Sequence, residues 1–205
     1  SIGLVMDPDA KTTLAFVDND ETGDRSFSFY RKPGADMMLR EDEVNYELID
    51  NCRIFHFGSL SMTDEPVRSA TYAMIDYAKK KNKIISFDPN LRPPLWESED
   101  LAAKQIWYGI EQCDILKIAD NEIEWLTGTD DYDKGIEIIR ERTHAKLINV
   151  TLGPNGSIAY YGDHKVFMEP YLNKGTIETT GAGDTFGACA LHAVLKNGLD
   201  NMTEE

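Results

Sequence analysis

The chain has 205 residues and a formal net charge of −15, with 41% hydrophobic and 10% aromatic residues. This composition predicts a folded globular protein rather than a disordered one. The strong negative charge disfavours a nucleic-acid surface or an anionic membrane as a partner, and no apolar run is long enough to span a membrane.

Cysteine usage and the two ends of the sequence bear on where the protein works. Cys52, Cys113 and Cys189 lie far apart and form no CxxC pair, so neither a disulfide framework nor a zinc site is expected, and the cytoplasm is the expected compartment. The sequence does not begin with Met, carries no signal peptide and stops shortly after a helix-like segment. We expect a fragment of a longer protein.

The first expected element is a β-hairpin. Residues 12–18 and 26–31 alternate or run apolar, and they flank the polar turn NDETGD. The aromatic residues Phe27, Phe29 and Tyr30, without an intervening helix, predict a small β-lid that stands off the main sheet. Its apolar face would need cover from substrate or from a second subunit.

Strand-like and helix-like segments then alternate to the end of the chain. The expected strands are residues 53–58, 83–88, 114–119 and 146–152, followed by a hairpin of 157–162 and 164–169. The expected helices are residues 65–82, 100–112, 121–128 and 134–143, and a last helix after Gly183. This alternation predicts an α/β fold with a doubly wound, mainly parallel sheet. We divide the chain into the lid hairpin with its lead-in, 1–35, and the α/β domain, 36–205.

In such a sheet ligands bind beyond the carboxyl ends of the strands. One loop there, residues 178–186, reads ETTGAGDTF. Its glycines allow close backbone approach, and their N–H groups can hold negative charge that develops on a transferred phosphoryl group. An ordinary glycine turn with Asp184 as a helix cap is the structural alternative. The spacing matches neither GxxxxGK[ST] nor GxGxxG.

Two further loops allow a functional and a structural interpretation. In NEIE, Asn121 and Glu124 lie three residues apart, on one helical face, where they suit a hydrated hard ion or form a capping box. In TLGPNG, residues 151–156, the glycines and proline contact a ligand or simply turn the chain into the next hairpin. The four histidines show no ligand spacing and are assigned to structure or surface.

At TTGAGDTF the sequence resembles the C-terminal signature of the ribokinase-like (PfkB) carbohydrate kinases, most closely the fructokinases. The resemblance implies that Gly181, Ala182 and Gly183 form an anion hole and that Asp184 is the base that takes the proton from the sugar hydroxyl. It implies that Glu124, and Asn121 through water, hold Mg²⁺ near the phosphates.

Further binding residues follow from the same resemblance. It assigns nucleotide contacts to Thr151, Gly153, Gly156 and Asn121. SFYRKPGADMML and DPNLR are also similar to fructokinases, and they imply sugar contacts from Arg31, Asn90 and Arg92 beside Asp184, although Arg31 alone could be a solvated charge at a strand end. The family's N-terminal sugar-binding motifs and the C-terminal segment of its adenine pocket have no counterpart in this sequence.

The favoured function is therefore ATP-dependent phosphorylation of a sugar primary hydroxyl, that of fructose at O6, in an enzyme that uses Mg²⁺ and can dimerise through the lid. Alternatives are a kinase for another sugar or sugar acid, such as 2-keto-3-deoxygluconate, and a non-catalytic sugar or nucleotide sensor on the same fold. A dinucleotide-binding dehydrogenase is a weaker alternative because GxGxxG is absent.

Overall fold

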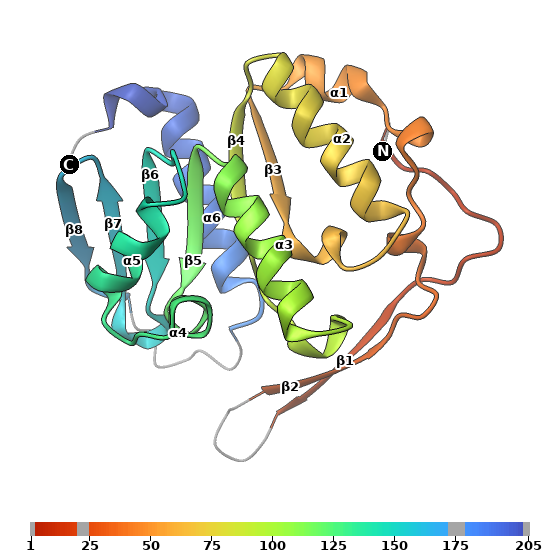
Figure 1. Ribbon diagram of the computed structural model, residues 1–205, viewed down its shortest axis with the longest axis horizontal. Coiled ribbons are helices and arrows are strands. Elements are labelled where there is room, and N and C mark those ends of the chain that lie inside the picture. The colour runs from red at the N-terminus through yellow and green to blue at the C-terminus, as the bar shows by residue number, and fades with distance from the viewer. Residues whose placement is uncertain (1–2, 20–24, 172–178, 203–205) are drawn as a thin grey trace.

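The computed structural model describes residues 3–19, 25–171 and 179–202. Within them a six-stranded sheet has the order β3-β4-β5-β6-β7-β8 (Figure 1). Its strands are β3 (Ile54–Gly58), β4 (Ile84–Asp88), β5 (Ile115–Ala119), β6 (Leu147–Thr151), β7 (Ser157–Tyr161) and β8 (His164–Met168). Neighbours from β3 to β6 pair in parallel, whereas β7 and β8 are antiparallel. The expected α/β fold with a mainly parallel sheet is confirmed.

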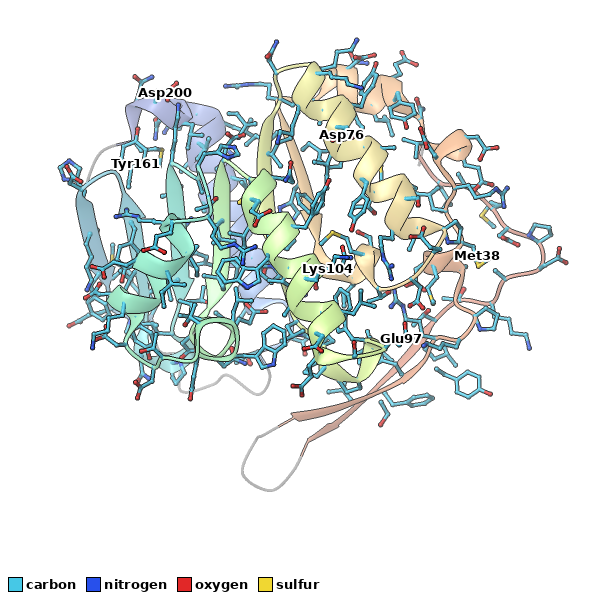
Figure 2. The ribbon with its side chains drawn as sticks, in the orientation of Figure 1. Met38, Asp76, Glu97, Lys104, Tyr161 and Asp200 are labelled. Carbon is cyan, nitrogen blue, oxygen red and sulfur yellow. The ribbon has the colours of Figure 1, made fainter. Side chains whose placement is uncertain are left out.

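Four helices cover one face of this sheet, and a fifth crosses the other face (Figure 1). The four are α2 (Val67–Lys80), α3 (Glu99–Gln112), α4 (Asp120–Thr127) and α5 (Tyr132–Arg140), and the fifth is α6 (Ala182–Asn197). Polar side chains such as Asp76 of α2 and Lys104 of α3 lie on the exposed surface of the helical layer (Figure 2). None of the described helices combines the length and apolar character needed to cross a membrane.

The short elements were not predicted from the sequence. Helix α1 (Tyr46–Asn51) has six residues, is capped by the Asn45 side chain and packs against α2. Single-turn 3-10 helices are η1 (Ala35–Met37), η2 (Glu41–Glu43), η3 (Ser59–Met62), η4 (Pro93–Leu95), η5 (Gly153–Asn155) and η6 (Leu199–Asn201). Two of them, η3 and η4, follow strands β3 and β4 and shape the loops at the carboxyl edge of the sheet.

The side chains on the α6 face of the sheet change from apolar to polar along each parallel strand. Near the amino ends, this face carries Ile54, Ile84, Ile115 and Leu147, which belong to the same apolar cluster as Leu191 and Val194 of α6. Two residues further along each strand, the same face carries His56, Ser86, Lys117 and Asn149. Strand register places His56 opposite Ser86 and Lys117 opposite Asn149. The carboxyl half of this face is therefore a polar surface beneath the start of α6.

The lid is a two-stranded antiparallel sheet, β1 (Leu14–Asn19) with β2 (Arg25–Tyr30), separate from the main sheet (Figure 1). Phe16 and Tyr30 are 60% and 76% exposed, while Phe29 is half-buried. The side chain of Phe27 lies outside the described part of the chain. The expected β-lid is confirmed, and it leaves apolar side chains uncovered.

Candidate active site

A cavity of about 190 Å³ opens at the carboxyl ends of β3 and β4, beside the start of α6. It is lined by His56, Gly58, Ser59, Leu60, Ser61, Asp88, Asn90 and Asp184. The Ser59 hydroxyl oxygen is buried and has no hydrogen-bond partner among the described residues. A buried hydroxyl without a partner is costly, and the other polar side chains that line the cavity suit it to a polar ligand.

Asp184 is the third residue of α6, which begins at Ala182. Gly181 occupies the N-cap with φ of 79°, a left-handed conformation that glycine adopts without steric strain. The interpretation of Asp184 as the helix cap is wrong, because the N-cap is a residue with no side chain. The Asp184 carboxylate is instead exposed and lines the cavity. The positive end of the helix dipole lies beside it, and the first N–H of the helix, that of Ala182, donates to the Thr179 carbonyl at 3.0 Å.

Two charged residues from the central strands lie next to this turn. Lys117 Nζ is 3.2 Å from Oδ1 and 3.1 Å from Oδ2 of Asp88, and both side chains are about nine-tenths buried, 11% and 10% exposed. Burial raises the pKa of Asp88, while the neighbouring Lys117 acts in the opposite direction. On β3, His56 Nδ1 lies 3.1 Å from Ser86 Oγ. The site thus contains an ion pair that the sequence did not predict.

The start of α4 is held by a different residue from the one expected. Glu122 is buried, and its carboxylate accepts the N–H groups of Ala119 at 2.8 Å and Leu91 at 2.7 Å. Burial raises the pKa of Glu122. The capping box proposed for Asn121 and Glu124 is wrong, because the N-cap is Ala119, two residues earlier, and the helix begins at Asp120. Glu122 closes this helix and ties it to the loop after β4.

Asn121 and Glu124 are therefore not needed as caps, and both are exposed. Within the described residues no three His, Cys, Asp or Glu side chains cluster in a way that could hold a metal ion by themselves. One carboxylate and one amide on the same helical face are a sparse set of oxygen donors. Such a set fits Mg²⁺, which keeps most of its water ligands in proteins.

The loop after β6 lies beside the start of α4, because Thr151 pairs in register with Ala119. Gly153 has φ of 55° and open space around it, whereas a Cβ added at Gly156, with φ of 102°, would collide with the Met168 carbonyl oxygen. The tight turn into the hairpin of β7 and β8 is thus sufficient to explain why residue 156 is a glycine. Nucleotide contacts from Thr151, Gly153 and Gly156 stay predictions.

Arg31 joins the base of the lid to the wall of the cavity. It is 6% exposed, and its guanidinium donates from Nε to Asp36 at 2.7 Å, from Nη1 to Thr63 Oγ1 at 2.9 Å and from Nη2 to the Leu60 carbonyl at 2.9 Å. Thr13, just before β1, donates to the same Asp36 carboxylate. These hydrogen bonds connect Thr13 and Arg31, at the base of the lid, to Asp36 and Thr63. The sugar contact predicted for Arg31 stays a prediction, and in this structure three of its nitrogens are bonded to protein acceptors.

The other two predicted sugar residues lie on the loop after β4. Asn90 lines the cavity and has φ of 45°, a left-handed conformation uncommon for residues other than glycine. Arg92 donates to the Leu91 carbonyl at 2.9 Å and is not among the residues that line the cavity. The structure therefore brings Asn90 and Asp184 together, but not Arg92.

Several residues of the cavity were missed in the sequence analysis. Asp88, Ser59 and Ser61 were not singled out, and His56 was assigned to structure or surface. Two signals were available: a carboxylate directly after the apolar run of β4, and an isolated lysine within the apolar run DILKIA. Both mark polar residues at the carboxyl ends of buried parallel strands, where ligands bind.

Residues 2–201 match the family described as pfkB family carbohydrate kinase. The chain belongs to this family. Among relatives of this pfkB-family chain, the probable fructokinase-2 of Arabidopsis thaliana is 42% identical over 193 residues, which cover 94% of this chain and 58% of the plant protein. The chain thus spans less than two thirds of the length of that relative.

Solved structures of bacterial fructokinases have the same fold as this pfkB-family chain. Fructokinase from Xylella fastidiosa with bound ATP superposes with a TM-score of 0.82 at 31% identity, over 93% of this chain and 58% of that one. Fructokinase from Vibrio cholerae O395, bound to fructose, ADP and a calcium ion, gives a TM-score of 0.82 at 31% identity, over 92% and 60%. The expected resemblance to fructokinases is confirmed.

Proposed function

We propose that this chain is the catalytic part of an ATP-dependent sugar kinase that converts fructose to fructose 6-phosphate. The observation that carries the proposal is the position of Asp184, an exposed carboxylate on a glycine-started helix that faces a cavity at the carboxyl edge of the sheet. The fructokinase relatives, and the ATP, fructose and ADP in their solved structures, support the same substrates here.

In the proposed reaction, Asp184 accepts the proton of the sugar hydroxyl as its oxygen attacks the γ-phosphorus of ATP, and the bond from that phosphorus to the ADP oxygen breaks. The backbone N–H groups of Gly181, Ala182 and Gly183 hold the phosphoryl oxygens while negative charge is redistributed. The Ala182 N–H, which donates to the Thr179 carbonyl at 3.0 Å in this structure, exchanges that partner for the phosphoryl group. A Mg²⁺ ion, held by Glu124 and through water by Asn121, would neutralise charge on the phosphate oxygens.

The remaining assignments are parts of the same proposal. The nucleotide lies along Thr151, Gly153 and Gly156 with Asn121, supported by the pairing of Thr151 with Ala119 at the start of α4. The sugar is contacted by Arg31, Asn90 and Arg92, of which Asn90 lines the cavity. The exposed apolar side chains of the lid support a homodimer formed through that sheet. We also propose the cytoplasm as the compartment and residue 35 as the boundary between lid and α/β domain.

A coupled assay of ADP release tests this function against fructose, glucose, ribose and 2-keto-3-deoxygluconate, with the product located by phosphorus NMR. We expect turnover with fructose, dependent on Mg²⁺, and phosphate on O6. Turnover with 2-keto-3-deoxygluconate alone would show that the substrate is this sugar acid rather than fructose, while the proposed phosphoryl transfer would stand. Binding of sugar or ATP without any ADP release would instead support the sensor alternative.

A further inference from the structure

Lys117 is a charged residue in the middle of a buried strand. Its neighbours along β5, Leu116 and Ile118, are fully buried on the opposite face of the sheet, among the side chains under α2 to α5. Two residues earlier on its own face, Ile115 packs in the apolar cluster with Val194 of α6. An apolar side chain would continue this packing, so the lysine requires another explanation.

The ammonium group lies directly behind the glycine turn that starts α6. A Cβ added at Gly183 would be 3.2 Å from Lys117 Nζ and 3.8 Å from its Cε, so the glycine leaves room for the lysine to approach the backbone of the turn. Nζ is also 3.1 Å from the Asp88 carboxylate. The ion pair is thus a dipole whose positive end lies against Gly183.

The energetics of this pair do not favour a purely structural role. Burying two charges costs desolvation free energy, and a buried ion pair is commonly no more stabilising than apolar residues of similar volume. Charges act strongly, however, where little water screens them. The Asp88 and Asp184 carboxylates line the same cavity, and Lys117 provides positive charge among them.

We propose that Lys117 is a positioning residue of the anion hole: its ammonium, held by Asp88 behind Gly183, adds fixed positive charge to the site that receives the transferred phosphoryl group. The proposal rests on the proposed function. Lys117 acts through the turn rather than by touching substrate. The group it favours is the phosphoryl as negative charge spreads over its oxygens, more than ATP or ADP in the ground state.

The test compares Lys117→Met and Lys117→Arg with Lys146→Met, a matched control that removes an exposed lysine paired with Asp200 at the opposite edge of the sheet. Each protein is assayed for kcat and KM and followed in a thermal melt. Calorimetry then gives its affinity for ADP alone and for ADP with aluminium fluoride, which imitates the transferring phosphoryl group, with fructose present.

For Lys117→Met we expect kcat to fall about 10- to 100-fold, affinity for the aluminium fluoride complex to fall by a similar factor, and affinity for ADP alone to change much less. Lys117→Arg should recover part of both losses because it keeps the charge, and Lys146→Met should match the wild type. A lower melting temperature with unchanged kcat and unchanged affinity for the fluoride complex would show a structural role and overturn the proposal.

Failure of the proposed function has a separate signature, since the wild type would then phosphorylate none of the sugars. In that case the calorimetry decides about Lys117. Weaker binding of the fluoride complex by Lys117→Met would still support the proposal. Equal binding by wild type and variant, including no binding by either, would overturn it.

Discussion

Helices α4 and α6 both start at the carboxyl edge of the same sheet, but their first turns are built in different ways. In α4 the buried Glu122 carboxylate accepts the N–H groups of Ala119 and Leu91, so this start is closed by protein atoms. In α6 the N-cap is Gly181, which has no side chain to offer. The Ala182 N–H donates to the Thr179 carbonyl at 3.0 Å, no side chain caps the helix, and Asp184 lines the cavity. A helix start closed by its own chain contributes to stability, whereas an open one is available to a ligand.

The largest expected effect is on the open start. Asp184→Asn keeps the size of the side chain but removes its ability to accept a proton, so turnover should fall by about 10²–10⁴-fold. The affinity for ATP should hold or rise, because a negative charge near the phosphates is removed. The measurement is kcat with fructose alongside a thermal melt. A stable variant with near-normal kcat would contradict the role of Asp184 as base.

The closed start should respond in stability instead. Glu122→Ala leaves two N–H groups without their acceptor in a buried place, and we expect the free energy of unfolding to fall by about 2–3 kcal/mol. Glu137→Ala, at an exposed glutamate of α5, is the matched control and should change it by less than about 0.5 kcal/mol. Urea unfolding measures both. If the two variants were equally stable, Glu122 would not be what closes α4.

Glu124 lies on the closed helix but takes no part in closing it. Glu124→Gln should therefore leave the free energy of unfolding within about 0.5 kcal/mol of the wild type. It should raise the Mg²⁺ concentration needed for half-maximal turnover, because a neutral amide binds a hard cation less well than a carboxylate. A Mg²⁺ titration of kcat that superposes on that of the wild type would remove Glu124 from the metal site.

A pair of glycines gives the smallest but most closely matched comparison. Gly181 precedes α6 with φ of 79°, Gly128 follows α4 with φ of 74°, and an added Cβ would meet no atom within 4 Å at either position. Replacement by Ala should cost each about 1 kcal/mol of stability from backbone strain alone. Only Gly181→Ala should also lower turnover, since it distorts the anion hole. Equal turnover of the two variants would show that the turn tolerates distortion.

Much of the architecture was predictable from the sequence because buried parallel strands appear as short apolar runs. The strands and long helices were placed to within a few residues, Gly128 was identified as the end of α4, and the lid was recognised from its polar turn. Helix α1, at six residues, is too short to show helical periodicity. The departures from the sequence prediction are therefore concentrated in short elements.

The candidate site was predictable only in part, because its missing contacts join residues distant in sequence. Lys117 and Asp88 are 29 positions apart, and Glu122 and Leu91 are 31 apart. Their pairing depends on the order of β4 and β5 in the sheet, which local spacing does not reveal. The partners of Arg31 depend in the same way on where η3 lies.

The two halves of helix α6 lie over different parts of the sheet. In the described part of the chain, Val194 is its one fully buried residue, and together with Leu191 it packs on the apolar half of the sheet, whereas the first two turns lie over the polar half. For protein engineering, the anchoring and the working positions are therefore separate. A library that randomises residues 185–189 and leaves 191 and 194 intact should therefore lose little folded protein.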